Sequence, residues 1–156
     1  IDFIRMNLEI EHFQVFEATN GIDALDMLVI SHDDSDHSGG YRSFLEELPA
    51  AVRLSGQPAA FPGSFSSCHD YPAWSWQETR FSFLQAGYDG SGDNNYSCVL
   101  LVEHPGVRIL LTGDITREAE QALIRRHPRI GNIDLLTMPH HGSRSSSSPG
   151  FVQFIK

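Results

Sequence analysis

The sequence predicts a mixed α/β fold, a sandwich with helices between some strands and hairpins between others. Two observations lead to this class. Short apolar runs of strand length alternate with turn-rich stretches, and one such run is followed by an apolar stripe with helical spacing. The chain has 156 residues, 40% of them apolar, which is enough for one hydrophobic core. We therefore expect a single domain over residues 1–156.

The first predicted elements are a strand, a helix and a hairpin. Residues 24–30, ALDMLVI, form an apolar run short enough for a buried strand. A helix lying on a sheet is predicted next, because apolar side chains recur at i, i+3, i+4 and i+7: Tyr41, Phe44, Leu45 and Leu48. Residues 56–73, rich in Gly, Pro and Ser, are expected to form a connection. A hairpin is predicted after it from alternating aromatic side chains: Trp74, Trp76, Phe81 and Phe83.

A second hairpin, a helix and a last strand are predicted for the remainder. Residues 97–103 and 107–112 flank the tripeptide HPG, which favours a hairpin with His104 in its turn. Thr116 is placed to cap the helix that follows, with Glu118 and Glu120 in its first turn. Three side chains of that helix are expected to face inward: Ala119, Ala122 and Leu123. The last strand is expected at residues 133–139.

Composition and charge limit the function classes. The formal net charge of −9 and the pI near 5.2 argue against tight, sequence-neutral binding of nucleic acid, but they leave a transient encounter open. No apolar run approaches the roughly 18 residues of a membrane span, and no signal peptide begins the sequence, so we expect this chain itself to be soluble. Cys68 and Cys98 are either buried thiols or one disulfide, and the residues alone favour thiols.

The stretch SHDDSDHSGG, directly after the first predicted strand, crowds histidines and aspartates together. His32 and Asp34 lie two residues apart and share one face of an extended turn, while Asp36 and His37 can turn to the other face. Imidazole and carboxylate suit a divalent first-row metal, and so many acidic groups are costly to bury without a cation. Two metals explain the crowding better than one. The alternative is a helix start decorated with acidic caps, but caps need no histidines.

Two further polar clusters follow predicted strands. Asp114 ends the strand of ILLTGDI and offers a carboxylate that could bridge two metals about 3.5–4 Å apart. Taken alone, a Gly-Asp pair after a strand is more often a turn. His140 and His141 in PHHGS add a further imidazole, and Gly142 allows close backbone approach to a substrate. The three clusters together, each at a strand end, favour a metal site. The remaining histidines are expected on the surface or in turns: His12, His69, His104 and His127.

Five stretches carry a family resemblance: SHDDSDHSGG, NNYSCVLLV, ILLTGDI, PHHGSRSSSSP and CHDYPAWSWQETRFSFL. Over residues 22–156 the chain resembles the metallo-β-lactamase-fold domain of the ComEC family of competence DNA-uptake channel proteins, of the proteobacterial type. The resemblance implies an αββα sandwich, a site for two divalent metal ions and, for the family, degradation of the DNA strand that is not imported. It places the domain on the extracytoplasmic side of the inner membrane, where disulfides persist, and so predicts that Cys68 and Cys98 approach closely enough to bond.

The resemblance also divides the ligands between two ions. It implies that His32 and Asp34 hold one metal and that Asp36 and His37 hold the other. Because Asp34 stands where many relatives of the fold have a histidine, the first site is expected to be rich in oxygen. Such a site favours Mn²⁺ or Mg²⁺ over Zn²⁺ in function, while Zn²⁺ can still bind.

The other ligands come from the later clusters. The resemblance implies that Asp114 lies between the two metals and that His140 or His141 completes the second site. Asn95, with Asn94 as the alternative, occupies a place where many relatives have a histidine. An amide is a poorer ligand, and an asparagine that only satisfies a turn is an equal alternative there.

Three roles in catalysis are expected from this arrangement. Asp36 or Asp114 would orient the attacking water, and Ser143 would contact the phosphate together with the backbone at Gly142. Arg144 could donate two parallel hydrogen bonds to the same phosphate. The alternative for residues 143–148 is a flexible loop without a role in chemistry.

Three functions remain open at this point. The first is a metal-dependent nuclease acting transiently on single-stranded DNA, beside the membrane-embedded channel portion of the same full-length protein and other competence proteins. The second is a DNA-binding or gating module without hydrolysis, favoured by the acidic charge and by Asn95. The third, a hydrolase of small esters or lactams, is disfavoured by Asp34 and the serine-rich tail.

The resemblance also predicts that the sandwich is incomplete at both ends. Domains of this family begin with a strand pair and a DTG-like stretch, and residues 1–21 contain nothing similar. The sequence FVQFIK comes before the final strand and helix that the fold is expected to have.

Overall fold

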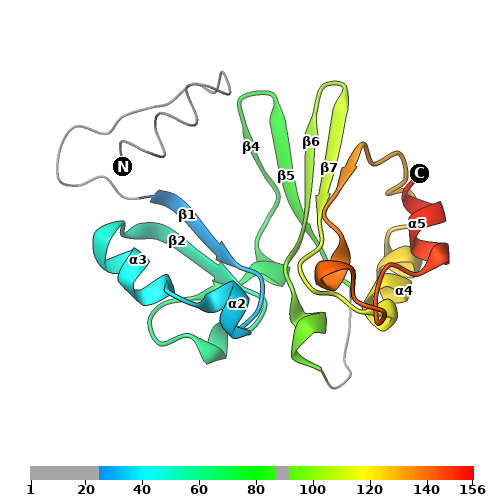
Figure 1. Ribbon diagram of the computed structural model, residues 1–156. Coiled ribbons are helices and arrows are strands. Elements are labelled where there is room, and N and C mark those ends of the chain that lie inside the picture. The colour runs from blue at the N-terminus through cyan, green and yellow to red at the C-terminus, as the bar shows by residue number, and fades with distance from the viewer. Residues whose placement is uncertain (1–24, 87–91) are drawn as a thin grey trace, which may run out of the picture.

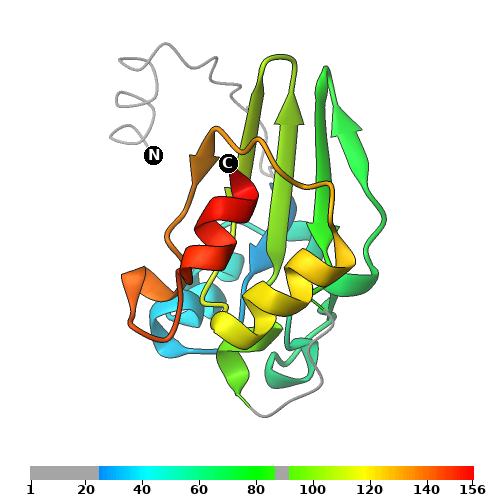
Figure 2. The same cartoon turned by 90° about the vertical axis from the view of Figure 1, so that its right-hand side faces the viewer.

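The computed structural model describes residues 25–86 and 92–156 as two facing sheets with helices on their outer faces (Figure 1). Helices α2 (Ser35–Ser38) and α3 (Tyr41–Glu47) accompany the first sheet, while α4 (Arg117–Arg126) and α5 (Pro149–Ile155) cover the second (Figure 2). This arrangement confirms the predicted αββα fold class. The expectations for residues 1–21 lie outside the described residues.

The first sheet is parallel, in the order β1-β2-β3. Its strands are β1 (Leu25–Ile30), β2 (Ala50–Ser55) and β3 (Ser66–Ser67). Parallel neighbours need a crossover, and α2 and α3 lie in it. The strand predicted at 24–30 and the helix predicted at 41–48 are confirmed. The stretch expected to be a plain connection contains β3 and two 3-10 turns, η1 (Pro58–Ala60) and η2 (Cys68–Asp70).

The second sheet has the order β4-β5-β6-β7-β8, antiparallel except for the last pair. Its strands are β4 (Trp74–Trp76), β5 (Thr79–Leu84), β6 (Val99–His104), β7 (Val107–Leu111) and β8 (Leu135–Leu136). Both predicted hairpins are confirmed, but the placement of His104 in the turn is wrong, because it pairs with Val107 as the last residue of β6. The last strand is shorter than predicted, because Thr112 N–H donates to the hydroxyl of Thr137 instead of continuing the backbone ladder.

The main core lies between the second sheet and its two helices. One face of the sheet supplies Leu84, Val99, Leu101 and Leu110, and the helices supply Ala119, Leu123 and Phe151 among others. The inward positions predicted for α4 are confirmed, since Ala119, Ala122 and Leu123 are buried. Thr116 stands at the N-cap position, but its side chain makes no capping bond. Its hydroxyl donates instead to Asn95 Oδ1 and to Glu118.

Helix α5 closes the described chain and has no counterpart in the sequence predictions. Ser148 caps it by accepting from Phe151 N–H, and Pro149 occupies its first turn, where a missing N–H costs nothing. Phe151 is completely buried against the second sheet and α4. Among the described residues, none of the helices has the length and apolar character needed to cross a membrane.

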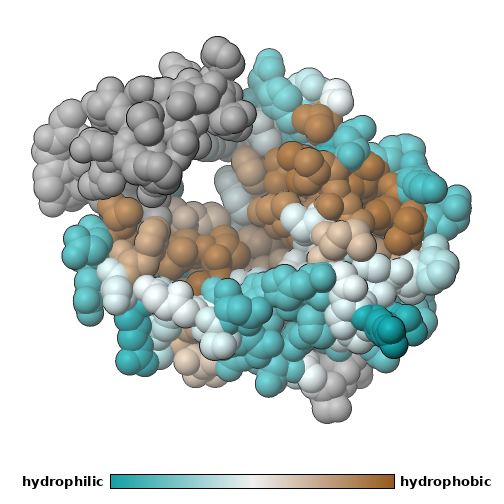
Figure 3. Space-filling view, in the orientation of Figure 1, coloured by the Kyte–Doolittle hydropathy of each residue, from teal (hydrophilic) through white to brown (hydrophobic). Residues whose placement is uncertain are grey.

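The opposite face of the second sheet turns toward the first sheet. Its register aligns Trp74, Phe81, Val102, Ile109 and Leu135 in one row across the five strands. Trp74 stacks on Phe81 with ring centroids 5.1 Å apart. In the view of Figure 3, apolar residues gather over the strands of both sheets on this side, and Leu135 remains 52% exposed.

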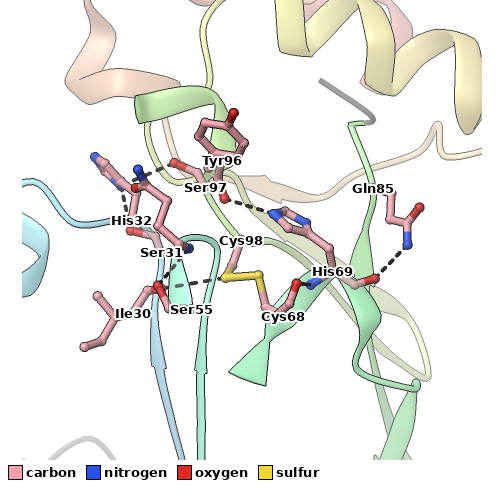
Figure 4. The surroundings of a disulfide bond; sticks show 12 residues. Ile30, Ser31, His32, Ser55, Cys68, His69, Gln85, Tyr96, Ser97 and Cys98 are labelled. Carbon is pink, nitrogen blue, oxygen red and sulfur yellow. Dashed lines mark hydrogen bonds between the residues drawn. A yellow bond between two sulfur atoms is a disulfide. The ribbon is translucent and has the colours of Figure 1, made fainter. Parts of the chain in front are cut away.

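A disulfide between Cys68 and Cys98 joins the two sheets (Figure 4). The Cα atoms lie 6.0 Å apart, and the bond ties η2 to the residue directly before β6. Both cysteines are buried beside Leu54 of β2. The expectation of free thiols is therefore wrong, and the pairing predicted from the family resemblance is confirmed. Spacing alone gave no sign of the pairing, because it depends on how the two sheets meet.

Candidate metal site at the strand ends

The polar clusters of the sequence meet where the two sheets converge (Figure 1). Strand β1 ends at Ile30 and leads to His32, while α2 carries Asp36 and His37. Strand β7 ends at Leu111 and leads to Asp114. The 3-10 turn η4 (Pro139–Gly142) carries the two adjacent histidines. Segments far apart in the sequence thus bring their polar ends to one place.

Four of the predicted ligands form one compact group: Asp36, His37, Asp114 and His141. One ligand atom from each lies within 4.8 Å of every other. His37 Nε2 is 3.2 Å from Asp114 Oδ1, and His141 Nε2 is 3.3 Å from Asp114 Oδ2. His141 Nε2 also lies 3.1 Å from Asp36 Oδ2. Converging imidazole nitrogens and carboxylate oxygens are the donor set that a divalent first-row metal prefers.

His32 and Asp34 stand beside this group as a pair. His32 Nε2 is 3.2 Å from Asp34 Oδ2, and the rings of His32 and His37 have centroids 4.2 Å apart. His32 is completely buried, and its Nε2 has no hydrogen-bond partner among the described residues. The short distance to Asp34 therefore does not have the geometry of a hydrogen bond. A buried, unpaired ring nitrogen is costly, and a cation beside Asp34 would satisfy it, so the residues fit a metal.

Two serines hold the far side of the histidine rings. Ser31 Oγ lies 3.1 Å from His32 Nδ1 and 3.0 Å from His37 Nδ1. Ser97 Oγ lies 3.3 Å from His32 Nδ1 (Figure 4), and it accepts a hydrogen bond from Asp114 N–H at 3.0 Å. Partners at Nδ1 leave Nε2 of each ring free to face a metal. The sequence predictions gave neither serine a role, although Ser31 directly follows the first predicted strand and Ser97 is the first residue of the strand predicted at 97–103.

The asparagines lie outside the compact group. Asn95 is buried, and its Oδ1 accepts hydrogen bonds from the backbone N–H and the hydroxyl of Thr116 at 2.8 and 3.0 Å. The amide nitrogen of Asn94 lies 3.2 Å from His140 Nε2. The arrangement around Asn95 corresponds to the alternative in which the amide satisfies the backbone at the start of a helix.

The two histidines of η4 point to different surroundings. His141 belongs to the compact group, whereas His140 Nδ1 lies 2.9 Å from Ser145 Oγ and its Nε2 faces Asn94. His140 also lines an open cavity of about 530 Å³ with Asn94, Thr116 and others. Both histidines have left-handed backbone angles, with φ of 49° and 52°. Such angles are strained for residues other than glycine, and strain of this kind is common at functional sites.

The predicted phosphate contacts lie at the surface near η4. The Ser143 hydroxyl is 3.0 Å from that of Ser145, and Arg144 is exposed. Both residues directly follow η4, and no hydrogen bond or ion pair joins either side chain to the four members of the group among the described residues. The pKa of the Asp36 carboxyl lies below its ordinary value, chiefly because a backbone N–H donates to it and also because His37 and His141 stand beside it. Asp36 is therefore an anion over the neutral pH range.

The remaining predicted histidines lie away from the group. His69 Nε2 contacts the carbonyl oxygen of Tyr96 at 3.0 Å (Figure 4). His104 Nδ1 contacts Thr79 Oγ1, and His127 is the C-cap of α4. These three positions agree with the expected surface and turn locations, apart from His104 being in a strand, while His12 lies outside the described residues.

The sequence was compared with known proteins and solved structures. Its residues 11–149 match the family model described as the metallo-beta-lactamase superfamily. The chain is 36% identical to "Competence protein ComA" of Neisseria gonorrhoeae over 138 residues, which cover 86% of this chain and 19% of that protein. It is 34% identical to "Recombination protein 2" of Haemophilus influenzae, with 85% and 17% covered. The chain therefore spans less than a fifth of the length of these relatives.

Two further matches were found. "Uncharacterized protein YcaI" of Escherichia coli is 39% identical, with 82% of this chain and 17% of that protein covered. The crystal structure of the metallo-beta-lactamase fold protein YhfI from Bacillus subtilis is 14% identical and has a TM-score of 0.44, with 74% of this chain and 50% of that one covered. The competence protein among these relatives agrees with the ComEC resemblance. With the family match over most of its length, the chain belongs to the metallo-beta-lactamase superfamily.

Proposed function

We propose that this domain is a metal-dependent phosphodiesterase that degrades one DNA strand during DNA uptake. The observation that carries the proposal is the compact group of Asp36, His37, Asp114 and His141 with the unpaired Nε2 of His32 beside it. The names of two relatives, a competence protein and a recombination protein, support DNA as the substrate. Because the chain spans only part of those relatives, their functions enter here as support for a proposal.

Two cations would be held by the residues as they stand. His32 and Asp34 would bind the first, and Asp36, His37 and His141 the second, with Asp114 between them. When bound, such a pair of ions supplies Lewis acidity that lowers the pKa of the attacking water and neutralises charge on the phosphodiester. Asp36 and His141 expose 61% and 64% of their side chains, so substrate and water can reach this side of the site.

The chain's own side chains would position the reactants. The anionic Asp36 and the buried Asp114 are placed to accept a hydrogen bond from the attacking water and so to orient it. Ser143, Arg144 and the backbone of Gly142 lie on the open side and would contact the phosphate, Arg144 as a two-pronged donor. No protein nucleophile is required in this scheme.

The metal that supports activity is proposed to be Mn²⁺, with Zn²⁺ able to bind. Asp34 gives the first site a carboxylate where an imidazole would favour zinc. Asp34→His should therefore raise the affinity for Zn²⁺ and reduce cleavage with Mn²⁺, each by roughly tenfold. Titration with both metals, followed by cleavage assays with each, measures this. A variant that keeps full activity with Mn²⁺ would show that Asp34 does not select the metal.

The proposed setting is a longer protein at the membrane. We infer that the domain, over residues 1–156 or most of them, stands on the extracytoplasmic side beside a membrane-embedded channel portion and meets single-stranded DNA and other competence proteins only transiently. The Cys68–Cys98 disulfide supports this side of the membrane, because disulfides persist in oxidising compartments. The net charge of −9 supports a transient encounter with DNA rather than tight binding.

A second candidate function is a DNA-binding or gating module without hydrolysis. It is favoured by one observation: Asn95 directs its oxygen to Thr116, which leaves the shared Asp114 as the one further side-chain ligand for the cation of His32 and Asp34 among the predicted ligands. A weak first site would leave the domain able to bind DNA but slow to cut it.

One assay separates the two candidates. End-labelled single-stranded DNA is incubated with the wild-type chain and with Asp114→Ala, in Mn²⁺, in Zn²⁺ and in a chelator. Cleavage by the wild type with Mn²⁺, lost in the chelator and in the variant, is the result expected of a nuclease. Binding of the DNA without any cleavage would favour the module instead.

A further inference from the structure

The serine-rich stretch after His141 is an ordered part of the fold. We call residues 143–148 the serine loop. The hydroxyl of Ser146 is buried and donates to the carbonyl oxygens of Pro139 and Ser143, at 2.7 and 3.0 Å. Ser143 N–H donates to the carbonyl of His140. These bonds close the chain on itself directly after η4, so the loop and the turn that carries His141 form one unit.

Glu120 of α4 holds this unit from the other side. Its side chain is completely buried, which is rare for a carboxylate without a partner. One carboxylate oxygen accepts a hydrogen bond from Ser147 N–H, and the other accepts from Ser148 N–H at 3.0 Å. At the start of the same helix, Arg117 N–H donates to the carbonyl of Ser145. The first turns of α4 therefore hold the serine loop through hydrogen bonds to three of its backbone groups.

The same helix begins shortly after Asp114. Only Ile115 and Thr116 separate Asp114 from α4, and Ile115 is completely buried, so the position of Asp114 is fixed relative to the helix. His140 N–H donates to the carbonyl of Gly113, which joins η4 to the residue before Asp114. Helix α4 thus sets the distance between Asp114 and His141, two members of the compact group that come from different parts of the chain.

His141 needs such support because its backbone is strained. It follows His140 and precedes Gly142, and all three have positive φ. Positive φ is unfavourable for a residue with a Cβ, so the turn would relax if its surroundings allowed it. The ring of His141 is 64% exposed, and its contacts to His37, Asp36 and Asp114 all lie within the site itself.

We propose that Glu120 is a positioning residue for the second metal: its buried carboxylate holds the serine loop closed, and the closed loop keeps His141 aimed at Asp36 and Asp114. This inference rests on the proposed role of His141 as a metal ligand. Glu120 does not touch the compact group, and it acts through the backbone of the loop.

The test is a double-mutant cycle read by metal affinity. The dissociation constants of both ions are measured by calorimetry for the wild type, Glu120→Gln, His141→Ala and the double variant. Glu120→Gln nearly preserves the volume but places an amide donor against one of the two N–H groups. Glu46→Gln, the same change at an exposed site on α3, is the matched control and should match the wild type.

The expected result is selective and non-additive. Glu120→Gln should lower the affinity for the second ion by tenfold or more and change the affinity for the first by no more than about twofold. In the His141→Ala background it should cause no further loss, since it acts through that residue. Ser146→Ala, which removes the bonds that close the turn, should weaken the same ion. It also provides a readout if Glu120→Gln does not fold.

Three results would overturn the inference: unchanged affinity in both Glu120→Gln and Ser146→Ala, an equal further loss in the His141→Ala background, or loss of both ions together with cooperative unfolding. The proposed function fails separately. If the wild type binds no ion, or if His141→Ala binds both ions normally, the ligand assignment itself is wrong.

Discussion

His32 is completely buried in the metal site, whereas His141, on the other side of the same site, exposes 64% of its side chain. The strand end that carries His32 is held from several directions. Ser31 carbonyl accepts from Cys98 N–H and Gly56 N–H, and the disulfide begins at Cys98. The turn that carries His141 is held through one loop and one helix. The half of the site around His32 is therefore fixed where the two sheets meet. The half around His141 depends on the serine loop and α4.

The space around two glycines differs in the same way between the two halves of the site. A Cβ on Gly56 would lie 1.7 Å from the carbonyl oxygen of Tyr96 and 2.6 Å from that of Ser31, so three chain segments pass too closely there for any side chain. A Cβ on Gly142 would meet nothing within 4 Å. The His32 half is therefore closely packed, whereas the turn that carries His141 has open space beside Gly142.

Asp114→Ala should have the largest effect, because Asp114 is the member that would join the halves. Its two oxygens lie 3.2 and 3.3 Å from the Nε2 atoms of His37 and His141, and its N–H bonds Ser97 beside His32. Without this carboxylate, two cations would face each other with less charge between them. We expect the affinity for both ions to fall by roughly a hundredfold or more, measured as metal per chain by mass spectrometry.

The control for this experiment is His104→Ala, at the far end of β6, which should leave metal content unchanged. Two tightly held ions in Asp114→Ala would show that the halves are independent and that Asp114 is only a turn residue.

Removing the disulfide should have the next largest effect. The bond closes a loop with a sequence separation of 30, so replacing both Cys68 and Cys98 by serine should cost about 3–4 kcal/mol of unfolding free energy. Urea denaturation of the oxidised wild type and the double variant measures it. Because the bond supports the His32 half, the affinity for the first ion should fall more than the affinity for the second. An equal loss of affinity for both ions would contradict the division of the site into a His32 half and a His141 half.

Ser31→Ala should have the smallest effect, and it should affect both halves of the site. The Ser31 hydroxyl contacts Nδ1 of His32 in one half and of His37 in the other, so its loss should weaken both ions by about tenfold. Ser31→Thr keeps the hydroxyl and should restore most of the affinity. If the alanine variant weakens only one ion, each histidine ring is oriented by other contacts.

The elements with clear periodicity could be predicted from the sequence. Strand β1, helix α3 and both hairpins follow from apolar spacing, and α4 follows from its inward face. Strand β2 lacks such a signal, because its central Arg53 interrupts the apolar run and the strand is stabilised by its place beside β1. Helix α5 begins with Pro149 and Gly150, which in sequence favour a turn, and it forms because Phe151 enters the core.

The site, too, could be predicted from the sequence only in part. Histidines and aspartates at strand ends are rare enough to mark a candidate metal site, and four of the predicted ligands do meet in one group. Ser31, Ser97 and Glu120 carry no comparable pattern. Glu120 stands in the first turns of α4, where an acidic residue is expected to interact with the helix dipole, and only the tertiary structure shows it buried against the serine loop. Contacts of this kind depend on which segments the fold brings together.

The placement of the tryptophans gives the protein a built-in optical probe of its sheet. The chain has two tryptophans, and both lie in β4, at the edge of the second sheet and outside the metal site. Trp74 stacks on Phe81, whereas Trp76 is 64% exposed. Ultraviolet emission should therefore contain a component shielded from a soluble quencher and one open to it. Unfolding of the sheet should abolish the shielded component, while binding or removal of metal should leave it in place.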